Sequence, residues 1–96
     1  QPVSGRILAL IKPQFEAGRA QVSKGGVVRS ISVRRQVLRD VLGFAMAIGL
    51  YPKDLMLSPL RGPAGNVEYL SLLTQTDYGC STIEKLVGKV APDAPT

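Results

Sequence analysis

The sequence has no histidine and a single cysteine, Cys80, and these shortages narrow the chemistry that it can perform. One cysteine cannot form a disulfide within the chain, which favours a reducing, cytoplasmic compartment. Without histidine or clustered cysteines a zinc site is not expected, and no metal ligands are assigned. No apolar run approaches the ~20 residues that a membrane-spanning helix needs, so no membrane association is predicted.

The charge of the chain is unevenly distributed. The 96 residues carry 12 basic and 7 acidic side chains, a net charge of +5, and 45% of the residues are hydrophobic. Up to Asp40, eight basic residues accompany two acidic ones, whereas the remainder has a net charge of −1. The length allows one domain with a modest core. A basic half and a near-neutral half favour a polyanionic partner, although a basic surface without a function is an equal alternative on charge alone.

The pattern of apolar residues predicts the order strand, long loop, helix, strand, strand, helix. The continuous apolar run in residues 6–14 is typical of a buried strand covered on both faces. Ser32 is expected to cap a helix over residues 33–48, which Gly49 and Pro52 end. A capping box over residues 81–84 predicts a last short helix. The other elements are predicted as a loop at 15–30, strands at 54–58 and 67–74, and a loose tail at 91–96.

The lengths of the connections predict how the three strands pair. The first two strands are joined through a helix and should run parallel in a right-handed crossover. The third follows too short a connection for another helix and should run antiparallel. If it inserts between the other two, its start lies beside the end of the first strand. This α/β arrangement, a three-stranded mixed sheet with a central antiparallel strand, would bring Lys12 and Glu68 together.

Three sequence blocks, in this order, carry a family resemblance. They are Ile11-Lys12-Pro13-Gln14-Phe15-Glu16-Ala17-Gly18-Arg19, then Lys24-Gly25-Gly26-Val27-Val28-Arg29, then Ser58-Pro59-Leu60-Arg61-Gly62-Pro63-Ala64-Gly65-Asn66-Val67-Glu68-Tyr69-Leu70. On these blocks the chain resembles the C-terminal portion of the TlyA-type (haemolysin A-like) proteins, a branch of the FtsJ-like ribosomal RNA 2′-O-methyltransferases. The resemblance covers residues 7 to about 73.

The resemblance implies a catalytic role for two residues. The family uses a Lys-Asp-Lys-Glu tetrad on a Rossmann-like fold, in which Lys12 matches the second lysine and Glu68 the glutamate. Lys12 would then assist deprotonation of a ribose 2′-hydroxyl, which attacks the methyl group of S-adenosylmethionine, and Glu68 would orient the lysine. A cationic amine also stabilises the developing alkoxide. The three strands would be the last three of a seven-stranded sheet.

The chain also departs from the family pattern. No glycine-rich turn joins a strand to a helix, so the cofactor-binding half of the fold is absent. The first lysine, the aspartate and the N-terminal RNA-binding domain of the family have no counterparts, and Ser30 stands where an acidic residue is common. Residues 1–90 are therefore interpreted as a partial methyltransferase domain, inactive alone, followed by a flexible tail at 91–96.

Several basic residues are candidates for RNA contacts. Arg19, Lys24 and Arg29 belong to the long loop, which is interpreted as an RNA or cofactor lid or, equally, as a surface loop. Arg61 lies in the loop before Glu68. The arginines at 34, 35 and 39 fit an ordinary exposed helix face better than a phosphate-binding row. Two alternatives to the enzyme fragment remain, namely a stand-alone RNA-binding module and a structural fragment that forms a homodimer through an exposed strand edge.

Overall fold

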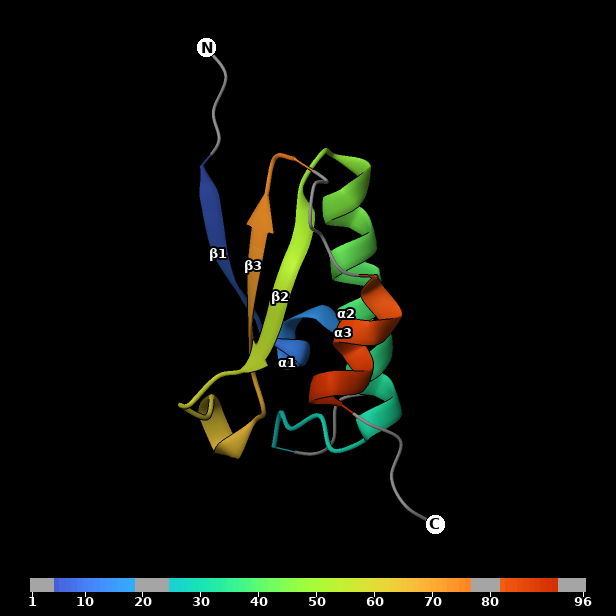
Figure 1. Cartoon of the computed structure of the whole chain (residues 1–96). Coiled ribbons are helices and arrows are strands. Elements are labelled where there is room, and N and C mark those ends of the chain that lie inside the picture. The colour runs from blue at the N-terminus through green and yellow to red at the C-terminus, as the bar shows by residue number, and fades with distance from the viewer. Residues whose placement is uncertain (1–4, 19–24, 77–81, 92–96) are drawn as a thin grey trace.

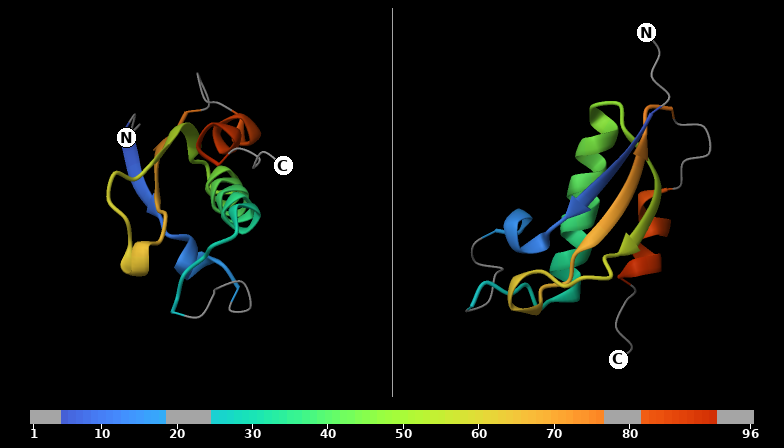
Figure 2. Two further views of the ribbon diagram at one scale, coloured as in Figure 1. Left: turned by 90° about the horizontal axis from the view of Figure 1, so that it is seen from below. Right: turned by 90° about the vertical axis from the view of Figure 1, so that its left-hand side faces the viewer.

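A computed structural model describes residues 5–18, 25–76 and 82–91. The described chain forms two layers, a three-stranded sheet and two helices that cover one of its faces (Figures 1 and 2). The elements in chain order are β1 (Arg6–Ile11), α1 (Pro13–Glu16), α2 (Ile31–Ala47), β2 (Tyr51–Leu57), a 3₁₀ turn η2 (Pro63–Gly65), β3 (Tyr69–Thr74) and α3 (Ile83–Val90).

The strand order is β1-β3-β2, which confirms the predicted insertion of the third strand between the other two. β3 runs antiparallel to both neighbours, so β1 and β2 run parallel to each other without touching. The β1–β3 register runs from Arg6 opposite Thr74 to Ile11 opposite Tyr69. Pairing of two copies along an edge strand stays a prediction.

The limits of the strands differ from the sequence prediction. β1 ends at Ile11, because Pro13 begins the single turn of α1 rather than merely closing the strand. β2 starts at Tyr51 and runs through Pro52, where the register with β3 shifts. Proline is tolerated here because β2 is an edge strand. β3 begins at Tyr69, two residues later than predicted.

The main helix is capped by a different serine from the one predicted. The hydroxyl of Ser30, not Ser32, accepts a hydrogen bond from the Val33 amide at 3.3 Å, so α2 begins at Ile31. α2 ends at Ala47, one residue before the predicted end, and Gly49, which was predicted to end the helix, has a φ of +88° that favours glycine. The last helix, α3, begins at Ile83 after Thr82, whose hydroxyl accepts a hydrogen bond from the Lys85 amide at 3.3 Å, while Ser81 of the predicted capping box lies outside the described residues.

The core lies between the sheet and the two long helices. Its centre is Leu38, Leu42 and Leu55, each fully buried. Ala91, which was predicted to belong to the loose tail, is also buried in this core, while the rest of the tail lies outside the described residues. The other core residues are Ile11, Val37, Ala45, Tyr69, Leu73, Leu86 and Val87.

The opposite face of the sheet has no covering layer within the described chain. Leu8 on β1 is 67% exposed and Met56 on β2 is 49% exposed. With Leu70 and Leu72 of β3 they line a shallow apolar groove. The expectation that the first strand is buried on both faces is therefore wrong for this chain by itself, because helices pack on one side only.

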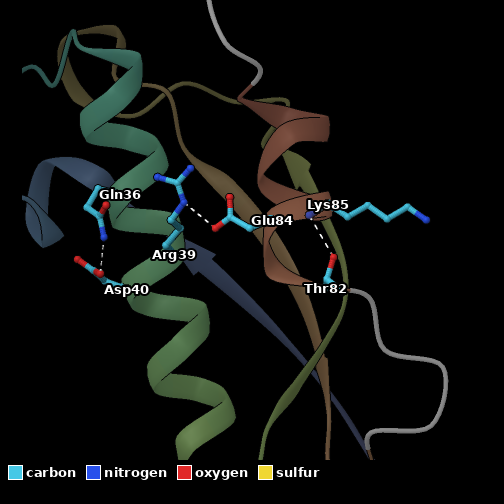
Figure 3. A network of polar contacts seen from close by, with 6 residues as sticks. All are labelled: Gln36, Arg39, Asp40, Thr82, Glu84 and Lys85. Atoms are coloured by element: carbon cyan, nitrogen blue, oxygen red, sulfur yellow. Dashed lines mark hydrogen bonds and ion pairs between the residues drawn. The ribbon is translucent and has the colours of Figure 1, made fainter.

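Among the described residues, α3 forms ion pairs with α2 and with β2. The Arg39 guanidinium of α2 pairs with the Glu84 carboxylate at 2.7 Å, as Figure 3 shows. Lys89 pairs with Asp54 of β2 at 2.6 Å. Both pairs are solvent-exposed, and their contribution to stability is therefore small and sensitive to salt.

The Arg39–Glu84 pair predicts a pH-dependent effect of Glu84→Gln. The Arg39 guanidinium lowers the pKa of Glu84. A lowered folded-state pKa stabilises the protein above the unfolded value of about 4.3, and this contribution is lost as the pH falls through the folded-state value. Thermal melts at low salt should show a slightly lower Tm for Glu84→Gln at neutral pH, and this difference should shrink as the pH falls below about 4. A difference that persists in acid would show that the ion pair is not its cause.

Candidate active site at one end of the sheet

Lys12 and Glu68 occupy adjoining positions at the same end of the sheet. Lys12 directly follows β1 and Glu68 directly precedes β3, and the last ladder pair between these strands is Ile11 with Tyr69. The next position along each strand is therefore Lys12 on one side and Glu68 on the other. On its second side the Glu68 carbonyl accepts a hydrogen bond from the Ser58 amide at 2.8 Å. Three chain segments thus converge at this end of the sheet.

The two charged side chains have different surroundings. Glu68 is 6% exposed, and its Oε2 accepts a hydrogen bond from Gln14 Nε2 at 2.7 Å. Lys12 is half-buried, and its ammonium lies 5.8 Å from the centroid of the Phe15 ring. A buried carboxylate and an amine at one end of a sheet are groups that can orient and move a proton.

Gln14 is a component of this site that sequence reasoning missed. Its Nε2 donates to Glu68 across 54 residues of sequence. Its Oε1 is buried without a hydrogen-bond partner among the described residues. An unpaired buried acceptor costs about 1–3 kcal/mol. The position of Gln14, two residues after Lys12, was a signal that the sequence offered. The direction in which the Gln14 side chain points, however, depends on the turn of α1.

Gly62 is the second component that was missed. A Cβ at this position would overlap the Glu68 carboxylate, lying 2.7 Å from its Cδ, and would lie 3.0 Å from Gln14 Nε2. The φ of Gly62 is −79°, so any residue could adopt its φ. The requirement for glycine is therefore steric, and the Gly62-Pro63 pair, which predicts only a turn, does not reveal it.

Asn66 connects two loops beside the site. It is 1% exposed, and its Oδ1 accepts from the Val28 amide at 2.9 Å. Its Nδ2 donates to the carbonyls of Gly26 and Pro63 at 2.8 and 2.9 Å. One buried amide thus fixes the segment before α2 against the loop that leads to Glu68.

The predicted RNA-contacting residues lie in different environments. Arg29 is exposed near the start of α2, and Arg61 is exposed but donates to the Gly65 carbonyl at 3.0 Å. Arg19 and Lys24 lie outside the described residues.

Arg34 departs from the expectation of an exposed helix face. Its Nε donates to the Tyr69 hydroxyl at 3.1 Å, and one Nη donates to the carbonyls of Val28 and Arg29. Arg34 therefore attaches the chain before α2 to the start of β3.

A cavity of about 360 Å³ lies between α1 and α2, lined by Glu16, Val37, Asp40, Val41 and Phe44. Among residues 5–18, 25–76 and 82–91, no helix is long and apolar enough to cross a membrane. The same residues contain no group of three or more side chains of the types that hold metal ions.

Comparison with known protein families identifies the fold. The model of the family of FtsJ-like methyltransferases matches residues 2–75. The chain belongs to the FtsJ-like methyltransferase family. The family assignment agrees with the sequence resemblance, and the matched region includes all three strands together with Lys12 and Glu68.

The most similar proteins include curated relatives and a solved structure. The 16S/23S rRNA (cytidine-2′-O)-methyltransferase TlyA of Mycobacterium tuberculosis is 41% identical over 92 residues, which cover 93% of this chain and 34% of that protein. Hemolysin A of Brachyspira hyodysenteriae is 41% identical over 64 residues, 67% of this chain and 27% of its own length. A hemolysin-type protein from Lactococcus lactis matches with a TM-score of 0.76 at 40% identity, covering 90% of this chain and 43% of that one. The chain thus spans about a third or less of the two curated relatives.

Gly62→Ala should disturb the site much more than an alanine elsewhere. The added methyl group would displace the ends of the Glu68 and Gln14 side chains and disrupt the hydrogen bond between them, so we expect a loss of about 0.5–1.5 kcal/mol in the free energy of unfolding. Gly88→Ala is the matched control, because nothing lies within 4 Å of its Cβ position in α3, and it should stabilise the protein by up to about 1 kcal/mol. Denaturant unfolding measures both changes. Equal stability of Gly62→Ala and the wild type would contradict the steric requirement.

Proposed function

We propose that the chain is the C-terminal part of a cytoplasmic, S-adenosylmethionine-dependent ribosomal RNA 2′-O-methyltransferase, with ribosomal RNA or a ribosomal subunit as its partner. The observation that carries this proposal is the adjoining position of Lys12 and Glu68 where β1 ends and β3 begins. The family assignment and the TlyA relative support the reaction class. Within it, Lys12 and Glu68 would be the second lysine and the glutamate of the catalytic tetrad.

In this proposal Lys12 acts on the ribose 2′-hydroxyl. The hydroxyl is a very weak acid, so an amine beside it can assist removal of the proton and stabilise the negative charge that develops on the oxygen. Glu68 is buried and oriented by Gln14, so it can fix the direction of the lysine side chain. S-adenosylmethionine would supply the methyl group.

The described residues of this chain do not fit the methyl donor. No glycine-rich turn joins a described strand directly to a helix. S-adenosylmethionine would therefore be held by residues beyond these 96, and we expect no catalysis by the chain alone.

The RNA would approach the same end of the sheet. Arg29 and Arg61 are exposed on two loops that the Asn66 side chain connects. Their positive charge suits a phosphate backbone. Arg19 and Lys24 complete the proposed set, which would contribute an affinity that falls steeply with salt.

The catalytic proposal predicts the effect of Lys12→Ala in the complete methyltransferase that carries these residues. Loss of the amine should reduce kcat for methyl transfer to ribosomal RNA by about 10²-fold or more. Lys85→Ala is the matched control, because Lys85 is exposed on α3 and its side chain points away from α2 (Figure 3), and its variant should retain wild-type turnover. Near-normal turnover of Lys12→Ala would remove this lysine from the mechanism.

The missing cofactor half predicts the behaviour of the 96-residue chain. Calorimetric titration with S-adenosylmethionine should give no saturable binding at concentrations up to about 1 mM. A Kd of about 1 mM corresponds to a binding free energy of about −4 kcal/mol, so any affinity of the chain should be weaker than this. The complete methyltransferase is the positive control in the same titration. Tight binding by the chain alone would show that it holds the methyl donor itself.

A further inference from the structure

We propose that Gln14 is a positioning residue that fixes the orientation of the Glu68 carboxylate for methyl transfer. This inference rests on the proposed function, because it assigns Gln14 a role in that reaction. Gln14 would act through Glu68 and would not touch the reacting atoms.

The backbone of Gln14 is held close to Lys12 by the turn that follows β1. Lys12 is the N-terminal flanking residue of α1, and its carbonyl accepts hydrogen bonds from the amides of Phe15 and Glu16 at 2.9 and 3.2 Å. Pro13 is fully buried at the first position of the turn. The same short turn therefore determines the positions of Lys12 and of Gln14.

The hydrogen bond between Gln14 and Glu68 has one chemically sensible direction. An ionised carboxylate only accepts hydrogen bonds, so the Gln14 amide must present its Nε2 to Glu68 and turn its Oε1 away. At 2.7 Å the bond is short, as expected for a charged acceptor. Because Oε2 is held, the position of the second carboxylate oxygen of Glu68 is fixed as well.

Gly62 holds the same carboxylate from another direction. Because Gly62 has no Cβ, there is room beside its Cα for the Glu68 carboxylate and the Gln14 amide. Any side chain at position 62 would occupy this room. The Glu68 carboxylate is thus confined by the hydrogen-bond donor of Gln14 on one side and by the backbone of Gly62 on another. This confinement leaves the carboxylate little freedom to rotate, which is what a group that orients a catalytic lysine requires.

The surroundings of Gln14 are not those of a residue that serves stability alone. Its Oε1 is buried and has no hydrogen-bond partner among the described residues. An unpaired buried oxygen destabilises the fold, so an apolar side chain at this position would make the protein more stable. Gln36 provides the contrast. Its Nε2 donates to Asp40 at 2.8 Å, but this pair lies exposed on one helix, as Figure 3 shows.

A double-mutant cycle in the complete methyltransferase tests the inference. Gln14→Met keeps the length of the side chain and removes the donor. We expect it to reduce kcat by about 10-fold, with KM for RNA changed less than about 2-fold. The double variant with Glu68→Gln should be no slower than Glu68→Gln alone, because Gln14 acts through Glu68. Gln36→Met is the matched control and should retain wild-type kcat.

Gln14→Glu provides a second variant of nearly the same shape. It places a carboxylate against Glu68 in place of the donor, and we expect kcat to fall at least as far as in Gln14→Met. Circular dichroism and thermal melts establish the folded fraction of each variant, so that kcat refers to folded enzyme. A purely structural role would lower the folded fraction and leave this kcat unchanged.

The outcomes separate the two proposals. If the wild type transfers methyl groups and Lys12→Ala does not, but Gln14→Met behaves like Gln36→Met, the role of Gln14 is refuted and the proposed function stands. Losses that multiply in the double variant would also refute action through Glu68. If the wild type transfers no methyl group to ribosomal RNA, the proposed function fails and the role of Gln14 fails with it.

Discussion

The central strand β3 is hydrogen-bonded on both sides, and the arrangement of the candidate site depends on this pairing. Because β3 runs against both neighbours, its start lies beside the ends of β1 and β2. Lys12 and Glu68 reach the same end of the sheet for this reason alone. A slip of one residue between β1 and β3 would turn every side chain of the shifted strand to the other face and would separate the carboxylate from Gln14.

The loops at this end are held to the sheet by buried polar groups. Asn66 joins the segment at 26–28 to the loop before Glu68, and Arg34 ties the same segment to the Tyr69 hydroxyl. These groups are costly to bury unless they are paired, so their bonds define one arrangement of the loops. The backbone at Gly62 can then lie close enough to the Glu68 carboxylate to confine it.

The topology could be predicted from the sequence, because connection length restricts how strands can pair. A helix between the first two strands and a short connection to the third left few arrangements. Local details were harder. Ser30 and Ser32 are both good caps, and only the hydrogen bond to Val33 distinguishes them. Pro52 resembled a stop signal because the sequence does not show that β2 lies at an edge.

The candidate site could be predicted only in part. Lys12 and Glu68 were found because their family motifs are local in sequence. Gln14 was missed because its role depends on a contact with Glu68, 54 residues away in sequence. Gly62 was missed because the space beside it is filled by the side chains of Glu68 and Gln14, which only the folded structure brings together. The roles of Lys12 and Glu68 in catalysis stay predictions.

The opposite end of the sheet, where Arg6, Thr74 and Tyr51 lie in register, carries none of these constraints. Because the antiparallel ladder is anchored where Ile11 meets Tyr69, strands could gain or lose residues at the far end without moving the carboxylate. Substitutions and changes of strand length at the two ends of this short sheet are therefore subject to different structural constraints.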